Sequence, residues 1–159
     1  MKNMLTHLDK NGLPTMVDIA EKAVTRRSAT ARSIVALPAE VLTALVEGDI
    51  QTKKGSVFQT AIIAGIMAAK KTGELIPLCH PLGLDNCQVN IYFNEQQDVV
   101  IDCTATITAK TGVEMEALVG ASISALTIYD MCKALSHDIV IRETKLIEKT
   151  GGKSDFKRA

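Results

Sequence analysis

The chain has 159 residues, 47% hydrophobic and 3% aromatic, so we expect one domain (1–159) whose core is built from aliphatic and small side chains. Its 18 basic and 18 acidic residues balance, which argues against a nucleic-acid partner but allows a small anionic ligand held by a local basic cluster. The chain shows neither an apolar run of the roughly 18 residues that span a membrane nor a signal-peptide core, so a cytoplasmic protein is expected.

The four cysteines are scattered through apolar or strand-like sequence without a C-x-x-C pair, which favours buried, reduced thiols. A zinc site can be drawn from Cys79, His80, Cys87 and His137. Adjacent Cys-His ligands without paired spacing make that site poor, so no metal centre is predicted.

The first half of the chain predicts an irregular arm over residues 1–22, a strand near 29–37 and two helices. The first helix follows Pro38 and ends at Gly48, and the second covers about 56–71, where small residues allow close packing. The Lys53-Lys54-Gly55 loop precedes this second helix. A lysine and a glycine before a helix N-terminus can hold phosphate, although this signal alone is weak.

The second half predicts a constrained loop, a hairpin, a long helix and a last strand. Pro77 and Pro81 exclude a regular helix and restrict the backbone of Cys79 and His80 between them. Alternating apolar residues predict strands near 87–93 and 99–107, and another strand near 139–147 precedes a basic, glycine-containing tail over about 150–159.

The long helix is expected over about 112–135, with Thr111 and Glu114 in the spacing of a capping box. It is apolar almost all round, which is typical of a buried helix. One narrow polar line nevertheless follows it, in steps of three or four: Glu116, Gly120, Ser124, Thr127, Asp130, Lys133 and His137. Because buried charges need polar partners, this line is the predicted floor of an active site.

This order of elements is that of a split β-α-β unit. It predicts an α+β, ferredoxin-like fold with a four-stranded, mainly antiparallel sheet and helices on one face. The other sheet face would remain uncovered, so self-association is plausible.

Asp130 and Lys133 lie one helical turn apart, close enough to share a proton or a substrate. The alternative is a solvated ion pair. For Lys133 to transfer protons near neutrality its pKa must fall from about 10.4; burial would lower that pKa and Asp130 would raise it, and the residues leave both open. Glu114 has a structural alternative as the capping residue, whereas Glu116 near the helix start can accept N–H groups from a heterocycle.

Several strings in fixed order together resemble the molybdenum cofactor biosynthesis protein C (MoaC) family over residues 5–156. They are THLD (from Thr6), MVDI (from Met16), KKG (from Lys53), IPLCHPL (from Ile76), KTGVEMEAL (from Lys110), ALTIYDMCKA (from Ala125) and GGKS (from Gly151). One departure is visible, since Asp155 follows Ser154 where the family usually has a glycine.

The resemblance implies a lyase of molybdenum cofactor biosynthesis. This lyase converts a 3′,8-cyclised 7,8-dihydroguanosine triphosphate, made by an upstream radical enzyme, into cyclic pyranopterin monophosphate and releases pyrophosphate. The resemblance also implies a homohexamer, a trimer of dimers with sites at the dimer interface. It implies no resident cofactor, although magnesium can accompany the triphosphate.

The family's motifs carry site roles onto matching positions of this chain. Asp130 and Lys133 match its catalytic aspartate and lysine. The implied substrate-binding residues are Leu78, Cys79, His80, Met115, Glu116, Glu114, Lys54, Lys153 and Arg27.

Two other functions remain open at this stage. A non-catalytic nucleotide sensor of the same architecture would explain the fold but not Asp130 and Lys133 on an otherwise apolar helix. A metal-dependent phosphohydrolase could use His80, Glu114 and Glu116 together with Asp130, and its activity would not survive chelation.

Overall fold

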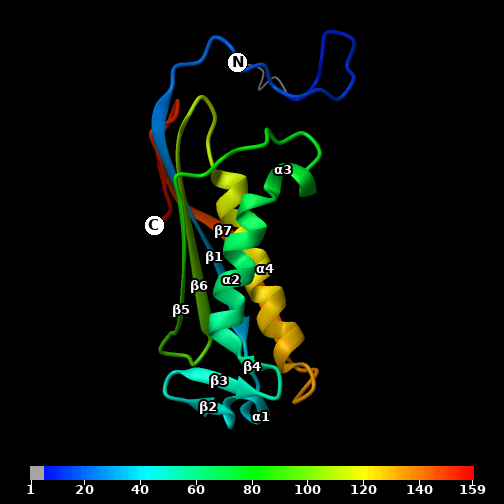
Figure 1. The fold of residues 1–159 in the computed structure, drawn as a ribbon, viewed down its shortest axis with the longest axis vertical. Helices are drawn as coiled ribbons and strands as arrows, with labels where there is room; N and C mark the ends of the chain where they lie inside the picture. Colours follow the sequence, from blue (N-terminus) through cyan, green and yellow to red (C-terminus); the bar gives the residue numbers. More distant parts are fainter. Residues whose placement is uncertain (1–5) are drawn as a thin grey trace.

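The computed structural model describes residues 6–159, in which two long helices lie side by side across one face of an antiparallel sheet (Figure 1). The helices are Val57–Lys70 (α2) and Glu114–Cys132 (α4). The sheet has the order β5-β6-β1-β7-β8, from strands Asn86–Phe93 (β5), Val99–Ala109 (β6), Thr25–Ala36 (β1), Val140–Thr150 (β7) and Phe156–Lys157 (β8). The helix α2 connects β1 to β5 in the chain, and in the sheet β6 lies between these two strands. The predicted ferredoxin-like α+β arrangement is therefore confirmed.

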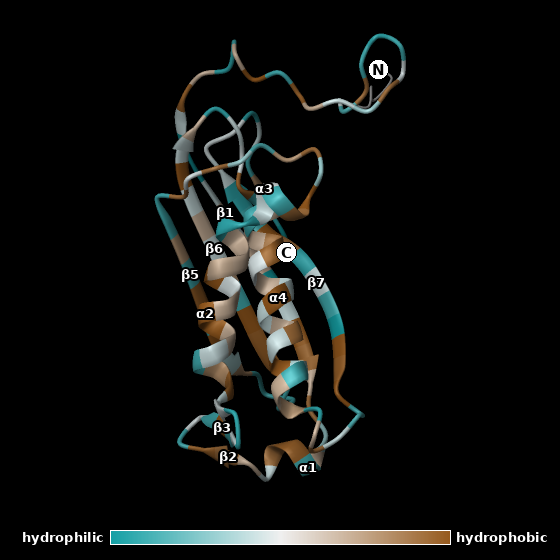
Figure 2. Ribbon diagram, turned by 45° about the vertical axis from the view of Figure 1, so that its right-hand side comes forward, coloured by the Kyte–Doolittle hydropathy of each residue, from teal (hydrophilic) through white to brown (hydrophobic). Residues whose placement is uncertain are grey.

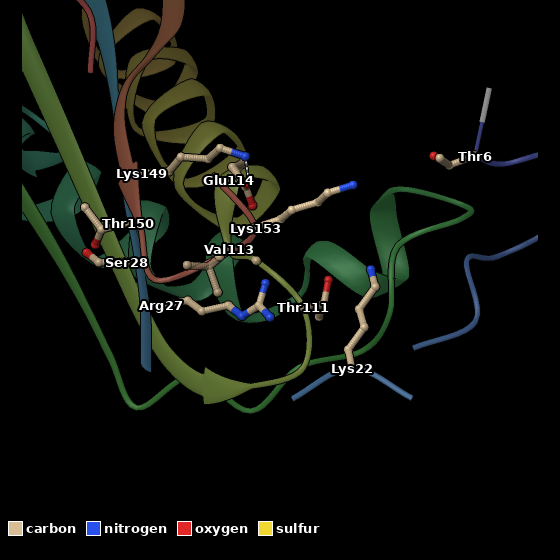
Figure 3. A pocket seen from close by; sticks show the side chains of 12 residues that line it. Thr6, Lys22, Arg27, Ser28, Thr111, Val113, Glu114, Lys149, Thr150 and Lys153 are labelled. Carbon is tan, nitrogen blue, oxygen red and sulfur yellow. Dashed lines mark ion pairs between the residues drawn. The ribbon is translucent and has the colours of Figure 1, made fainter. Parts of the chain in front are cut away.

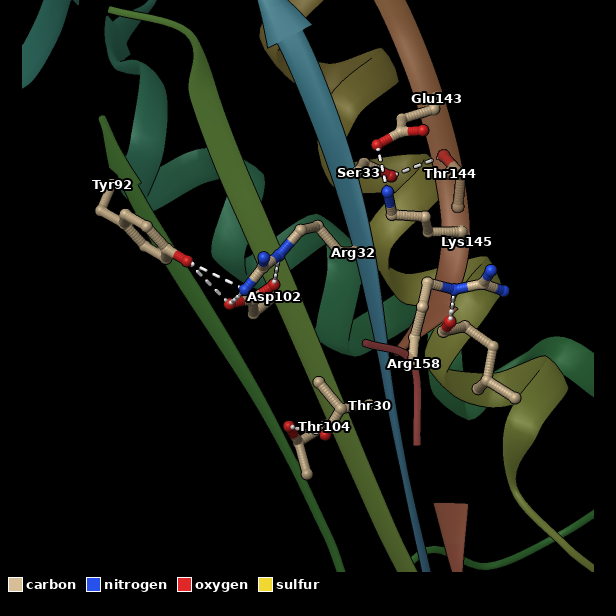
Figure 4. A network of polar contacts seen from close by, with 11 residues as sticks. Thr30, Arg32, Ser33, Tyr92, Asp102, Thr104, Glu143, Thr144, Lys145 and Arg158 are labelled. Carbon is tan, nitrogen blue, oxygen red and sulfur yellow. Dashed lines mark hydrogen bonds and ion pairs between the residues drawn. The ribbon is translucent and has the colours of Figure 1, made fainter. Parts of the chain in front are cut away.

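Side chains alternate across the sheet as a half-covered sheet requires. On β1, Ala29, Ala31 and Val35 are buried under the helices, while Thr30 and Arg32 lie on the open face. The open face is tied together by polar contacts (Figure 4): Arg32 donates two hydrogen bonds to Asp102 (2.7 and 2.9 Å), and Tyr92 donates to the same carboxylate (3.0 Å).

The helices α2 and α4 approach closely because small residues face each other. A Cβ added at Gly65 would lie 2.9 Å from the carbonyl oxygen of Gly120. Buried Ser124 donates to the carbonyl oxygen of Ala61 at 2.9 Å. The middle of the predicted polar line is therefore a packing seam between two helices, and the expectation that the whole line forms the floor of a site is wrong there.

The region expected as one helix from Pro38 to Gly48 is instead a short helix and a small sheet. Ala39–Leu42 (α1) is followed by Leu45–Val46 (β2), Asp49–Thr52 (β3) and Gly55–Ser56 (β4). Glu47 and Gly48 both have positive φ (49° and 83°), which is the two-residue turn that joins twisted strands. The Asp49 carboxylate accepts from the backbone N–H of Phe58 at 2.8 Å, so this hairpin is fixed to the start of α2.

Two further expectations need correction. A four-stranded sheet was predicted, but the basic tail returns as β8, so the main sheet has five strands. The long helix begins at Glu114 without any side-chain cap, so the predicted capping box of Thr111 and Glu114 is wrong.

The hairpin, the second helix and the last strand are confirmed near their predicted limits. A short helix, Thr72–Leu75 (α3), follows α2 and leads into the proline-bounded loop. Of the expected arm, residues 1–5 lie outside the described residues, and residues 6–24 contain one isolated bridge, between Leu8 and Pro14. Within residues 6–159, no helix is long and apolar enough to cross a membrane.

Candidate active site

A basic cavity of about 400 Å³ lies where α4 begins and β7 ends (Figure 3). We call its charged residues the α4-start cluster: Lys22, Arg27, Glu114, Lys149 and Lys153. Four cations face one carboxylate there, which suits a polyanionic ligand such as a chain of phosphates.

The α4-start cluster is fixed by contacts between distant parts of the chain. The Lys149 Nζ atom lies 3.0 Å from a Glu114 oxygen, so β7 is tied to the first turn of α4. Arg27 Nε donates to the Ala109 carbonyl oxygen at 3.2 Å, which holds the guanidinium on the end of β1. These contacts set the positions of the charges before any ligand arrives.

The tail reaches the same cavity through a turn at Gly151. Gly151 has a φ of +82°, and a Cβ there would collide with the carbonyl oxygen of Arg26. The N–H of Gly151 donates to Asp155 Oδ1 at 3.1 Å, so the residue that departs from the family pattern closes the tail turn. This turn brings Lys153 to the cavity that Arg27 lines.

The carboxyl group of Glu116 lies near the proline-bounded loop. Glu116 is 3% exposed, and burial, with a smaller contribution from the charge of Glu114, raises its pKa. Partial burial, and next the charge of Glu116, raise the pKa of the Cys79 thiol. Cys79, with Leu78 and His80 on either side of it in the chain, therefore lies near Glu116 at the start of α4, where Met115 is also partly exposed.

A second group of charges, the α4-end cluster, comprises Lys54, Asp130 and Lys133. The Asp130 carboxylate receives Lys133 Nζ at 2.9 Å and Lys54 Nζ at 3.2 Å. Hydrogen bonds from Lys133 and then from Lys54 lower the pKa of Asp130. All three side chains are more than half exposed (52–57%), and a cavity of about 580 Å³ lies beside Lys54 and Met131.

The predicted site residues thus fall into two groups at opposite ends of α4. Fourteen residues separate Glu116 from Asp130, which is about 21 Å along a helix. Within one chain, Asp130 and Lys133 therefore lie far from Glu116. Each end of α4 offers one part of a charged site.

Two cations of the α4-start cluster, Lys22 and Lys149, were not among the predicted site residues. Lys149 stands two residues before the Gly151-Gly152 pair, and Lys22 belongs to the basic group before β1, but neither position has a spacing that singles it out. Across residues 6–159, no three His, Cys, Asp or Glu side chains are grouped so as to hold a metal ion.

Comparison with known proteins gives a consistent set of relatives. Residues 16–152 match the MoaC family. A protein of Xanthomonas axonopodis pv. citri named cyclic pyranopterin monophosphate synthase is 57% identical over 96% of this chain and 92% of its own length. Molybdenum cofactor biosynthesis protein 1 of Dictyostelium discoideum is 50% identical over 96% of this chain but only 27% of its own, longer sequence. The molybdenum cofactor biosynthesis bifunctional protein of Synechocystis is 52% identical over 96% of this chain and 45% of its own.

Proposed function

The chain belongs to the MoaC family, and on this premise we propose that it is a lyase of molybdenum cofactor biosynthesis that forms cyclic pyranopterin monophosphate. The substrate is a 3′,8-cyclised dihydroguanosine triphosphate, and pyrophosphate leaves as the cyclic phosphate closes. The observation that carries this proposal is the division of charges along α4, with four cations around a cavity at one end and a lysine–aspartate pair at the other.

The α4-start cluster binds the triphosphate and the base in this proposal. Arg27 offers a planar fork of donors to phosphate oxygens, while Lys153 acts as a compact point charge. Buried Glu116 accepts N–H groups of the guanine-derived ring, with Leu78, Cys79, His80 and Met115 beside it. Glu114 holds Lys149 in place at 3.0 Å.

The α4-end cluster supplies the proton transfers. The rearrangement opens an imidazole ring and builds a pyrazine ring, so protons must move repeatedly. Lys133 is the proton-transferring group, and Asp130 at 2.9 Å orients it. Lys54 lies on the other side of Asp130 and neutralises phosphate charge as the diester closes.

A second copy of the chain joins the two clusters. Two copies related by a two-fold axis, with α4 helices antiparallel, bring the start of one α4 to the end of the other. Apolar segments run along both long helices (Figure 2), and Ile63, Met67 and Leu126 on them are 52–60% exposed, so the outer surface of the helix layer suits such a contact. Burying this surface would also withdraw Asp130 and Lys133 from bulk water.

Further features of the proposal follow the family. The protein assembles as a hexamer, a trimer of such dimers, in the cytoplasm, and receives its substrate from an upstream radical enzyme. It needs no resident cofactor, although magnesium can accompany the triphosphate.

The direct test incubates purified protein with the product of the radical enzyme. Stoichiometric pyrophosphate and a pterin that becomes fluorescent on oxidation are expected. Binding of the nucleotide without either product would support the sensor alternative instead. Activity that disappears on chelation and returns with a metal, with inorganic phosphate as the product, would support the phosphohydrolase.

A further inference from the structure

Two thiols lie in contact on the inner face of the β5–β6 hairpin. The sulfur atoms of Cys87 and Cys103 are 3.8 Å apart. In the strand register Cys87 is opposite Ala105, and Cys103 is opposite Val89, so the two cysteines are diagonal neighbours across adjacent strands. Of the four cysteines, all within the described residues, only these two are in sulfur–sulfur contact.

The two thiols differ in access to solvent. Cys103 is completely buried beneath α4, where a Cβ added at Gly120 would lie 2.5 Å from its sulfur. Cys87 is only partly buried and lines a cavity of about 460 Å³ between α2 and the loop before β5, together with Lys70 and Asp85. A small solute can therefore reach Cys87 but not Cys103.

The contact also divides the chemistry between them. The contact between the two sulfurs lowers the pKa of Cys87, although burial opposes this, while the same contact and burial raise the pKa of Cys103. Since the thiolate is the nucleophile, Cys87 is the thiol that reacts first.

We propose that Cys87 and Cys103 form a peroxide-reactive pair, in which Cys87 is oxidised and Cys103 resolves it as an internal disulfide. The Cys87 thiolate attacks hydrogen peroxide, forming an S–O bond, breaking the O–O bond and releasing hydroxide. Cys103 sulfur then attacks the sulfenic acid, an S–S bond forms, and the hydroxyl group leaves with the Cys103 proton as water. Two thiols thus supply the two electrons that reduce one peroxide to two waters.

The bond requires the two sulfurs, now 3.8 Å apart, to close to about 2.05 Å. Diagonal partners on antiparallel strands lie about 7–8 Å apart at Cα, beyond the usual span of a disulfide, so closure needs a shift of the β5–β6 backbone as well as side-chain rotation. Closure of the pair moves a side chain that packs against Gly120, one turn after Glu116 on α4.

The experiment treats the reduced, full-length protein with one equivalent of hydrogen peroxide, blocks remaining thiols with iodoacetamide and maps the peptides by mass spectrometry. The expected result is a peptide pair linked through Cys87 and Cys103, two hydrogens lighter than the free peptides and separated again by dithiothreitol. Cys79 and Cys132 should remain free thiols and therefore be alkylated by iodoacetamide. Linkage through any other pair, or oxidation of Cys79 before Cys87, would overturn the proposal.

Two matched variants assign the roles of the thiols. Cys103→Ser should stop the reaction at a Cys87 sulfenic acid that dimedone traps, whereas Cys87→Ser should leave Cys103 unreactive. Dimedone on Cys103 in the second variant would contradict the assignment. Circular dichroism establishes that each variant is folded, and the unsubstituted protein gives the linkage result even if a variant does not fold.

Discussion

The two ends of α4 carry similar charges in different surroundings. At its start, Glu116 is 3% exposed, and four cations surround a defined cavity. At its end, Asp130 and two lysines are more than half exposed, and their ion pairs are open to solvent and salt. One end thus has its charges grouped around a cavity within a single chain, while the charges at the other end become a site for proton transfer only in the dimer proposed above.

The largest effect is expected at the α4-end cluster. Lys133→Ala should lower kcat by about 10³-fold, within the range for loss of a general acid or base, while substrate binding is largely retained. Pyrophosphate release and calorimetric binding measure the two quantities. Lys71→Ala, a lysine at the end of α2 outside both clusters, is the control and should have no effect. Full turnover by Lys133→Ala would contradict the assigned role.

The next largest effect is expected at the α4-start cluster, on substrate binding. Lys153→Ala should raise KM about 10- to 100-fold, since a hydrogen bond to a charged group contributes about 1.5–3 kcal/mol. Lys153→Arg keeps the charge and should keep much of the activity. Steady-state kinetics of both variants check this, with Lys157→Ala on β8 as the control. If Lys153→Arg is as inactive as Lys153→Ala, a role through charge alone is wrong.

Stability should respond to pH in opposite senses at the two ends. Burial raises the pKa of Glu116, so the folded protein binds this proton more tightly than the unfolded chain does. Stability therefore falls as pH rises from about 4.5, the ordinary value, through the raised pKa of the folded state, and is constant above it. Glu116→Gln should remove this fall in stability. Urea unfolding across the same pH range measures it.

Asp130→Asn is the matched variant at the other end. The lysines lower the pKa of Asp130, so its small contribution to stability is present above 3.8 and is lost as pH falls through the lowered pKa. The difference in unfolding free energy between Asp130→Asn and the unsubstituted protein should thus be constant above pH 5. In the same pH range, the corresponding difference for Glu116→Gln should change. If the unfolding free energies of the two variants depended on pH in the same way, the predicted contrast between the two ends of α4 would be wrong.

The smallest effect concerns the first turn of α4. Thr111→Ala should change the free energy of unfolding by less than about 0.5 kcal/mol, because no side chain caps this helix. If Thr111 capped the helix, its replacement by alanine would lower the free energy of unfolding by about 1 kcal/mol. Urea unfolding decides between these values, and a loss of 1 kcal/mol or more would restore the capping box.

The elements confirmed from sequence are those that local periodicity specifies. The β5–β6 hairpin follows from alternating residues, and α2 from Ser56 before an apolar run that ends at Lys70. The failures occur where distant contacts override local pattern. Glu114 has capping-box spacing, but Lys149, 35 residues away, takes its carboxylate.

The candidate site shows the same division. The resemblance identified Asp130, Lys133 and Glu116, but a single helix cannot bring its two ends together, so their separation follows from geometry rather than motif. Lys54 meets Asp130 across 76 residues because the small β2-β3-β4 sheet, predicted as helix and loop, presents it there. Lys22 reaches the cavity from the irregular segment before β1, where no periodic pattern exists.

The most direct test of a site shared between two copies is complementation between inactive variants. Glu116→Gln alters the α4-start cluster and Lys133→Ala alters the α4-end cluster, and each is expected to be nearly inactive alone. If each site combines the start of one α4 with the end of another, random mixing of refolded subunits restores about a quarter of the sites, because half the dimers are mixed and each carries one intact site. Activity that stays at the level of the separate variants, although mass spectrometry shows mixed dimers, would contradict the account.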